Sequence, residues 1–137
     1  MNTLCFLSPW QALHEQEILL KIIKRTGSHF RETAGGMVLI AAHAVGQSPQ
    51  FPPIEFVHND QEAEDIELGP TGSLYSFTVV HPGKDKSPYG LAMVDFEPGV
   101  RAFGRLLFDT QPPAIGSRLR VVPFTLPDGT PDYAFQE

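Results

Sequence analysis

The sequence contains a single cysteine, Cys5, among its 137 residues, and it has no long apolar run. One cysteine excludes an internal disulfide framework and a four-cysteine zinc site, and it suits a reducing compartment. The longest apolar stretch, residues 37–42, is far shorter than the roughly 20 residues that a membrane-spanning helix needs. The N-terminus lacks the charged start, apolar segment and cleavage site that together form a signal peptide. We therefore expect no signal peptide, no membrane contact and a cytoplasmic protein.

Positive charge is also scarce, because ten Lys and Arg stand against 16 Asp and Glu, for a net charge of -6. Residues 1–70 hold four basic and nine acidic side chains, whereas residues 71–137 hold six and seven. Phosphate backbones are bound by accumulated Lys and Arg, so this balance disfavours nucleic acid as a partner.

The C-terminal half is rich in short segments of β-branched and aromatic residues, separated by turn-forming Pro and Gly. Five of these segments are predicted to be strands: 72–81, 89–96, 100–108, 118–124 and 133–136. Their number and length, with no helical periodicity, predict a small antiparallel barrel that fits the five-stranded OB-fold. The predicted fold class is therefore mainly β.

Alternation along these strands separates an inner face from an outer face. Along 100–108 the even-numbered residues are apolar or glycine and are predicted to fill the barrel. The outer face is predicted to carry cationic and aromatic side chains that are candidate ligand-binding residues: Arg101, Phe103, Arg105, Arg118 and Arg120. Gly104, in mid-strand, would cost packing and backbone entropy unless it marks a bulge or a sharp bend.

The N-terminal segment, residues 1–36, is predicted to contain a helix. Ser8 suits the N-cap, Pro9 suits the first helical position, and the helix is expected to run to about Arg25. Its apolar stripe is wider than one contact with a small barrel requires. It packs on its own domain or serves as a partner-docking surface, for which the candidate residues are Trp10, Leu13, Ile18 and Ile22.

Residues 37–70 are predicted to form a small β segment with an acidic linker, ahead of the barrel at 71–137. The stretches 37–42 and 54–57 are predicted to be strands. The run 59–67 holds five acids and no base, and is predicted to be a solvated loop without chemistry.

Three stretches together resemble a known family: GSLYSFTVVH at 72–81, YGLAMVDFEPG at 89–99, and GSRLRVV at 116–122 with the terminal Tyr133-Ala134-Phe135. They are similar to the OB-fold, acyl-CoA-associated family catalogued as domain of unknown function thirty-five, and the likeness covers roughly residues 37–137. In that family a rubredoxin-like zinc ribbon usually precedes the barrel, with two Cys-x-x-Cys knuckles around a Phe-Pro-Pro segment.

The resemblance implies that the ribbon of this chain is degenerate. Phe51-Pro52-Pro53 stands where the family segment belongs, and the four cysteine positions then fall near Ala42, Val45, Val57 and Asp60. None of these supplies a thiolate, so we expect no structural zinc. His43, His58 and Asp60 lie beside these positions, but their irregular spacing does not favour a tetrahedral metal site.

Family members resemble accessory subunits of thiolases and acyl-CoA hydratases that bind or cover the acyl-CoA without supplying catalytic residues. The resemblance thus implies a noncatalytic accessory subunit, not an enzyme, whose partners are a thiolase-like or hydratase-like enzyme and acyl-CoA. Self-association through the helix or the ribbon is a further expectation. Arginine can bind phosphates in a bidentate manner and stack on flat bases, so the outer-face arginines are candidates for binding coenzyme A.

The residues alone leave other hypotheses open. The arginines of the outer face either bind a ligand or solubilise the barrel through pairs with Glu97, Asp109 and Asp132. A second hypothesis is an OB-fold module that binds single-stranded nucleic acid. A third is a small enzyme that acts on an acyl thioester through His81 or Asp95, although no nucleophile, phosphate loop or metal-ligand spacing accompanies them. Asp95 needs a partner such as Arg101 or Arg120 if it faces inward.

Overall fold

The computed structural model describes residues 20–22, 29–53, 56–58 and 62–137. These residues form ten strands: β1 (Leu20–Ile22), β2 (Phe30–Thr33), β3 (Gly36–Ala44), β4 (Phe56–His58), β5 (Ala63–Leu68), β6 (Thr71–Val80), β7 (Tyr89–Phe96), β8 (Val100–Leu107), β9 (Arg118–Thr125) and β10 (Pro131–Gln136). The mainly β fold class is confirmed. Over the described ranges the chain has no helix, and hence none that could cross a membrane.

The predicted N-terminal helix is wrong at residues 20–22, the part of it that the structure describes. Residues 20–22 form β1, which pairs antiparallel with β4, so that Ile22 lies opposite Phe56. The Leu-Lys-Ile sequence of β1 also fits a strand, and pairing with another segment overrides a weak helical preference. The rest of the predicted helix, with the docking candidates Trp10, Leu13 and Ile18, lies outside the described residues.

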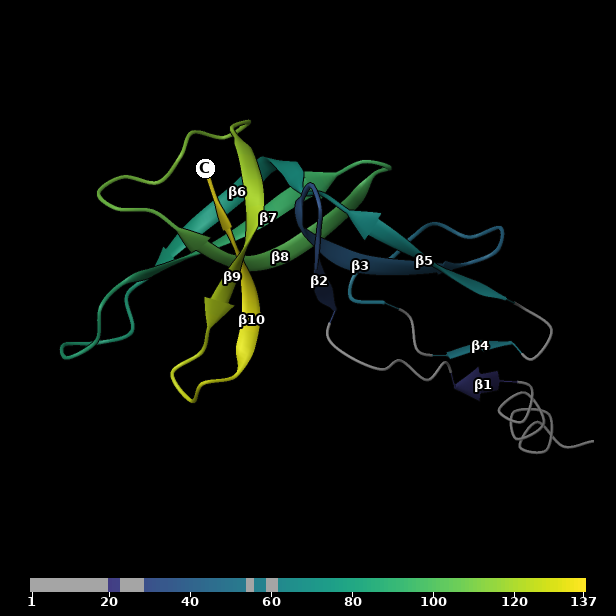
Figure 1. Cartoon of the computed structure of the whole chain (residues 1–137). Coiled ribbons are helices and arrows are strands. Elements are labelled where there is room, and N and C mark those ends of the chain that lie inside the picture. Colours follow the sequence, from purple (N-terminus) through teal and green to yellow (C-terminus); the bar gives the residue numbers. More distant parts are fainter. Residues whose placement is uncertain (1–19, 23–28, 54–55, 59–61) are drawn as a thin grey trace, which may run out of the picture.

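Strands β6 to β10 close the predicted five-stranded barrel (Figure 1). Strands β6, β7 and β8 are consecutive antiparallel neighbours, and β10 lies parallel to β8. Strand β9 then pairs antiparallel with both β10 and β6, which completes the circle. Closure pairs the strand edges that an open five-stranded sheet would expose.

The inward alternation predicted for 100–108 is confirmed in β8, where Val100, Ala102 and Leu106 are buried in the barrel core. In β9, Leu119 and Val121 are buried while Arg118 and Arg120 are exposed, as predicted for the two arginines. The buried side chains share the interior with apolar residues of β6, β7 and β10. Alternation therefore identifies the inner and outer faces of the barrel correctly.

The bulge predicted as one explanation of Gly104 is wrong. The register of β7 and β8 is continuous through the pair Ala92 and Gly104. The reason for glycine is instead close approach: an added Cβ would lie 2.7 Å from a ring carbon of Tyr133 and 2.9 Å from one of Phe135. The irregularity lies in β6, where the register shifts at Tyr75.

The acidic run predicted to be a solvated loop is, in its described part, strand β5. Strand β5 pairs antiparallel with β3, and its Leu68 is fully buried, while Glu64, Asp65 and Glu67 are exposed. Apolar residues between the acids allow the segment to bury one side. Charged side chains are common on strands at the edge of a sheet, where they oppose association with other chains.

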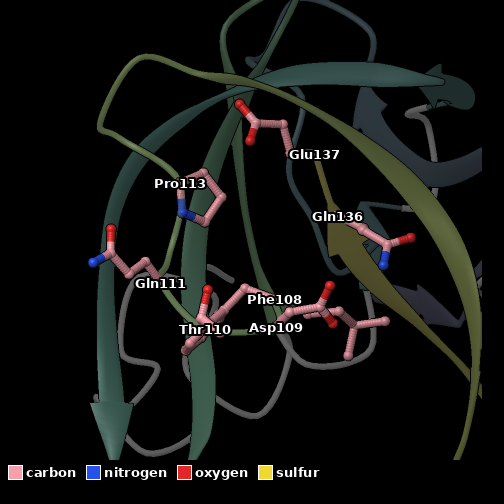
Figure 2. Close-up of a pocket in the computed structure, with 8 residues that line it drawn as sticks. Phe108, Asp109, Thr110, Gln111, Pro113, Gln136 and Glu137 are labelled. Carbon is pink, nitrogen blue, oxygen red and sulfur yellow. The ribbon is translucent and has the colours of Figure 1, made fainter.

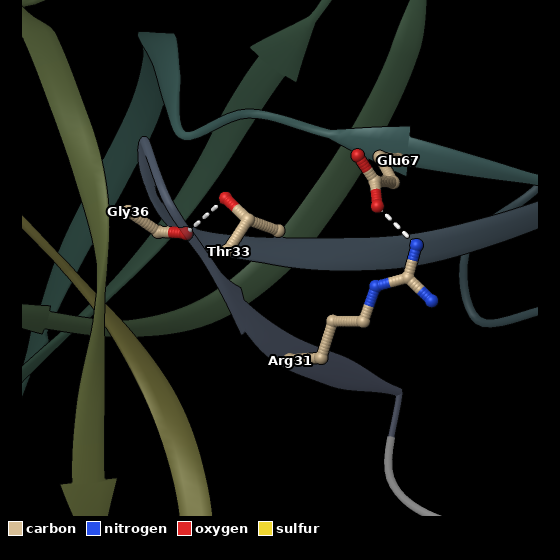
Figure 3. A network of polar contacts seen from close by, with 4 residues as sticks. All are labelled: Arg31, Thr33, Gly36 and Glu67. Carbon is tan, nitrogen blue, oxygen red and sulfur yellow. Dashed lines mark hydrogen bonds and ion pairs between the residues drawn. The ribbon is translucent and has the colours of Figure 1, made fainter.

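Strand β3 connects this N-terminal part to the barrel. It pairs with β2 and β5, and its Met37 lies opposite Val121 of β9. Its Leu39 and Ala41 belong to the same buried core as the barrel residues. Arg31 of β2 reaches across β3 to form an ion pair with Glu67 of β5 (Figure 3).

Aromatic rings continue this connection through residues 45–53, here called the Phe51 loop. The ring of Phe51 lies 5.8 Å from that of Tyr133, which lies 5.7 Å from Phe135, and Phe135 lies 6.1 Å from Phe96, measured between centroids. The Tyr133 hydroxyl also donates a hydrogen bond of 2.6 Å to the carbonyl oxygen of Phe103. The segment 29–53 and the barrel therefore share one packed core.

Candidate functional site

The candidate site is the solvent-facing side of β6, β7 and β8, here called the outer face and defined by Tyr75, Met93, Arg101, Phe103 and Arg105. Its positions follow from the strand register, which sets Met93 opposite Phe103 and leaves Tyr75 at the irregularity of β6. Three of the predicted ligand-binding residues, on alternate positions of β8, thus lie side by side as expected.

The centre of the outer face is apolar and open to solvent. The exposed fractions are 53% for Phe103, 39% for Met93 and 49% for Tyr75, which are high for large apolar side chains. A directly opposed pair on neighbouring strands has side chains in contact distance, so Met93 and Phe103 present one continuous apolar surface. Such surfaces on soluble proteins mark binding sites more often than isolated apolar residues do.

Arg101 at one end of the outer face is already paired. Its Nε and Nη2 atoms donate to the two carboxylate oxygens of Asp95 over 2.6 and 3.2 Å, and its guanidinium lies 3.4 Å from the centroid of the Tyr75 ring. The hydrogen bond to Asp95 raises the pKa of Arg101 above its ordinary value. Asp95 lies on the outer side of β7, so the condition under which it was predicted to need an arginine does not hold, but Arg101 still pairs with it and neutralises this end of the face.

Arg105 at the other end has aromatic neighbours instead of an acidic one. Its guanidinium lies 4.2 Å from the ring centroid of Tyr89 and 5.1 Å from that of Phe124, and the residue is half-buried. Among the described residues no carboxylate forms an ion pair with Arg105. Stacking on the two rings restricts the side chain while its N–H donors stay free for an anion or a carboxylate.

The other two predicted arginines do not join this group. Arg118 donates a hydrogen bond of 2.9 Å to Thr71 Oγ1 and lines a polar hollow of about 390 Å³ that also holds Asp95 and Glu97. Arg120 lies 3.4 Å from the side-chain oxygen of Gln136, beside a different hollow near the β2–β3 turn. The five predicted ligand-binding residues are therefore spread over more than one surface.

Comparisons with known proteins agree with this fold. Residues 65–123, from β5 to β9, match the family model described as "ChsH2, C-terminal OB-fold domain". The matched part of the barrel is thus similar to an OB-fold of the DUF35 family. A solved structure named "Ltp2-ChsH2(DUF35) aldolase" superposes with a TM-score of 0.57 at 20% sequence identity, covering 72% of this chain and 84% of that chain. None of the curated proteins matches the sequence.

The family match supports the resemblance for the barrel and leaves the ribbon as a prediction, because residues 37–64 lie outside the matched range. Near the predicted knuckles, the imidazole of His43 lies 3.4 Å from Glu64 and 2.9 Å from the carbonyl oxygen of Gln47. Within the described ranges no three His, Cys, Asp or Glu side chains are grouped as metal ligands. The prediction of no structural zinc remains a prediction.

A hollow of about 310 Å³ opens where β8 and β10 of the barrel end (Figure 2). It is lined by Phe108, Asp109, Thr110, Gln111 and other residues up to Glu137, and no Lys or Arg contributes to it. Its two acidic side chains make it unsuited to a phosphate group.

The predicted pairs of arginine with Asp109 and Asp132 do not form in the described structure, where Asp132 instead accepts a hydrogen bond from a backbone N–H.

The catalytic candidates of the third hypothesis gain no catalytic partners in the described part of the barrel. His81 is exposed immediately after β6, and Asp95 is engaged by Arg101 on the outer face. Cys5 lies outside the described residues. The described geometry thus offers a binding surface and not a nucleophile with its base.

Sequence reasoning missed four contributors to the outer face: Tyr75, Met93, Tyr89 and Phe124. Alternation in β7 already points Met93 outward, because its neighbours Ala92 and Val94 face the core. The role of Tyr75 depends on a strand irregularity, and the stacking of Phe124 on Arg105 depends on barrel closure. Neither feature has a signal in the sequence.

Proposed function

We propose that this chain is a noncatalytic accessory subunit that associates with a thiolase-like enzyme, or with an acyl-CoA hydratase-like one, and helps to bind or cover acyl-CoA. The observation that carries the proposal is the outer face, an exposed apolar surface between two restrained arginines on a DUF35 barrel. The similar solved structure is named as an aldolase that joins a DUF35 chain, ChsH2, to a second component, Ltp2.

The composition of the outer face favours a macromolecular partner. Tyr, Phe, Met and Arg are the residue types enriched in protein interfaces, and all four occur here within one set of neighbouring strands. Exposed apolar area of this kind is a liability for a chain that stays alone. Association with an enzyme subunit would remove it from water.

The acyl-CoA part of the proposal depends on Arg120, which lies apart from the outer face, beside the hollow near the β2–β3 turn. A guanidinium there can hold a phosphate group of coenzyme A while the outer face contacts the enzyme subunit. The bound thioester would then lie between this chain and the catalytic subunit, which supplies the reacting groups.

Single-stranded nucleic acid is the second candidate ligand, because OB-folds bind it by aromatic stacking beside cationic side chains. Phe103 and Arg105 offer those two contacts, but the net charge of -6 opposes the phosphate backbone. We expect a flat fluorescence titration with labelled oligonucleotides at low salt. Saturable binding that weakens as salt is added would instead support this alternative.

Copurification tests the accessory role. The full-length chain, carrying an affinity tag, is coexpressed with a thiolase-like enzyme from the same organism, and the eluate is analysed by size-exclusion chromatography with light scattering. We expect the enzyme in a fixed ratio to the tagged chain, together with saturable binding of an acyl-CoA by the pair. An eluate without the enzyme, or acyl-thioester turnover by the tagged chain alone, contradicts the proposal.

A further inference from the structure

We propose that the outer face is the docking surface for the enzyme subunit, with apolar contact at Met93 and Phe103 and a partner carboxylate bound by Arg105. This inference deepens the proposed function and rests on it. It commits to a partner surface of stated chemistry, namely an apolar side chain or cluster with an Asp or Glu at its rim.

Clustering of exposed apolar residues identifies the surface. Six large apolar side chains of the described chain are exposed, and three of them, Tyr75, Met93 and Phe103, lie together on the outer face. Val45 and Ile115 are more exposed individually, at 56% and 59%, but they lie in separate turns and have no such neighbours on a strand. Energetic hot spots in interfaces are clustered anchors, and isolated apolar residues rarely act as one.

Charge decides between a second copy of this chain and a different partner. Asp95 satisfies Arg101, whereas Arg105 has no carboxylate partner in the described part of the chain, so the face carries one uncompensated positive charge. Two copies placed face to face would bring two such charges together, and like charges in an interface are unfavourable. A partner with a rim carboxylate would satisfy Arg105 and is complementary to the face.

The docking residues are also held in place before any partner arrives. Two rings restrain Arg105, and the Tyr133 hydroxyl binds the carbonyl oxygen of Phe103 over 2.6 Å, beneath the exposed side chain. Strand residues whose conformation is already fixed lose little entropy on binding. The outer face is therefore suited to a stable interface and not only to a brief encounter.

The test measures the affinity of the full-length chain for the thiolase-like enzyme by isothermal titration calorimetry at several salt concentrations. Phe103→Ser removes the larger apolar anchor and is expected to weaken binding by about 10-fold or more. Arg105→Gln, which keeps a polar side chain, is expected to weaken binding by about 5- to 50-fold and to reduce its salt dependence.

Two matched variants serve as controls. Ile115→Ser makes the same chemical change as Phe103→Ser at an exposed apolar residue in a turn, and Arg31→Gln repeats the arginine change on β2, outside the outer face. Both are expected to bind within about 2-fold of the original chain, since surface changes outside an interface are nearly neutral. Thermal unfolding checks that each variant is folded, and Met93→Ser replaces Phe103→Ser if the latter is not.

The outcomes separate this inference from the function on which it rests. Absence of binding by the unmodified chain contradicts the accessory role itself. Normal affinity of the Phe103 and Arg105 variants, with the unmodified chain still bound, would overturn the docking surface alone. Loss of affinity in Ile115→Ser would overturn it by assigning the partner to a different surface. Self-association of the chain that Phe103→Ser abolishes would overturn it by assigning the outer face to a second copy.

Discussion

Tyr133 is the side chain on which the packing between the barrel and the Phe51 loop converges. Its ring lies within 6 Å of the rings of Phe30, Phe51 and Phe135, and its hydroxyl reaches the backbone of β8. The space for that ring exists because residue 104 has no side chain. One glycine and one tyrosine thus set how two segments distant in sequence meet.

Replacing Gly104 with alanine tests this close approach. The added Cβ would lie 2.7 Å from Tyr133 and 2.9 Å from Phe135, so ring or strand must shift, and we expect a loss of about 1–3 kcal/mol in the free energy of unfolding. Urea denaturation measures it. Gly35→Ala is the control, because nothing lies within 4 Å of the place its Cβ would take, and it should change stability by less than about 0.5 kcal/mol. Equal stability of both variants would show that the rings of Tyr133 and Phe135 move aside without a measurable energetic cost.

The titration of Tyr133 gives a second prediction. Burial, followed by the nearby Asp132, raises the pKa of Tyr133 to about 12 in the folded chain, from 10.0. The folded state thus holds the proton more tightly, and the associated stability is complete below pH 10 and is lost as the pH rises from 10 toward 12. Over this range the free energy of unfolding should fall by at most about 1.4 kcal/mol per pH unit, and by less because the ring is only partly buried.

The measurement compares the original chain with Tyr133→Phe by urea denaturation at several pH values. Below pH 10 the variant is expected to be less stable by about 1 kcal/mol, because it lacks the hydrogen bond to Phe103. Between pH 10 and 12 the difference should shrink as the tyrosine ionises. Since all other titrating groups are common to both proteins, a constant difference across this range would contradict the assigned pKa.

At the level of single residues, strand alternation predicts Arg101, Phe103 and Arg105 on one face, whereas the pair of Arg101 with the outward-facing Asp95 comes from the cross-strand register. Alternation carries no information on which strands become neighbours when the barrel closes. For that reason the stacking of Arg105 on Phe124, and the separation of Arg118 and Arg120 from the other candidates, come only from the structure.

Among the elements, β3 has the most demanding environment, since it pairs with β2, β5 and β9 and is buried along most of its length. Its predicted range, 37–42, falls within the observed Gly36–Ala44. A continuous apolar run is typical of a strand covered on both faces, which is why this element could be predicted well.

The Phe51 loop is expected to contribute to stability through packing. Phe51→Ala removes a partly buried ring that contacts Tyr133 and should lower the free energy of unfolding by about 1–3 kcal/mol. Arg31→Gln, which breaks the exposed ion pair with Glu67 in the same part of the molecule, should cost less than about 1 kcal/mol. Chemical denaturation of both variants checks the order, and a larger loss for Arg31→Gln would show that charge and not packing joins these segments.

Elements whose identity depends on distant pairing were the ones predicted incorrectly. Charge alone suggested a loop at 59–67, but β5 gains the hydrogen bonds of β3 and buries Leu68. Apolar spacing alone suggested a helix through residues 20–22, but β1 pairs with β4. Both segments are weakly biased locally, and a strand partner far along the chain determines their structure.

At the scale of the whole molecule, the OB-fold barrel and an N-terminal β segment share one core, and the barrel presents one face on which exposed apolar and arginine side chains gather. The five barrel strands were predictable because each is short, alternating and bounded by Pro or Gly. The proposed use of that face depends on a partner, whose surface the sequence of this chain does not contain.

Sedimentation velocity of the purified full-length chain mixed with the thiolase-like enzyme tests the accessory role most directly. We expect one faster boundary of fixed composition at micromolar concentrations, which gains saturable acyl-CoA binding and leaves catalysis to the enzyme subunit. Two boundaries that sediment independently at every mixing ratio, with no change on addition of acyl-CoA, would contradict the accessory role.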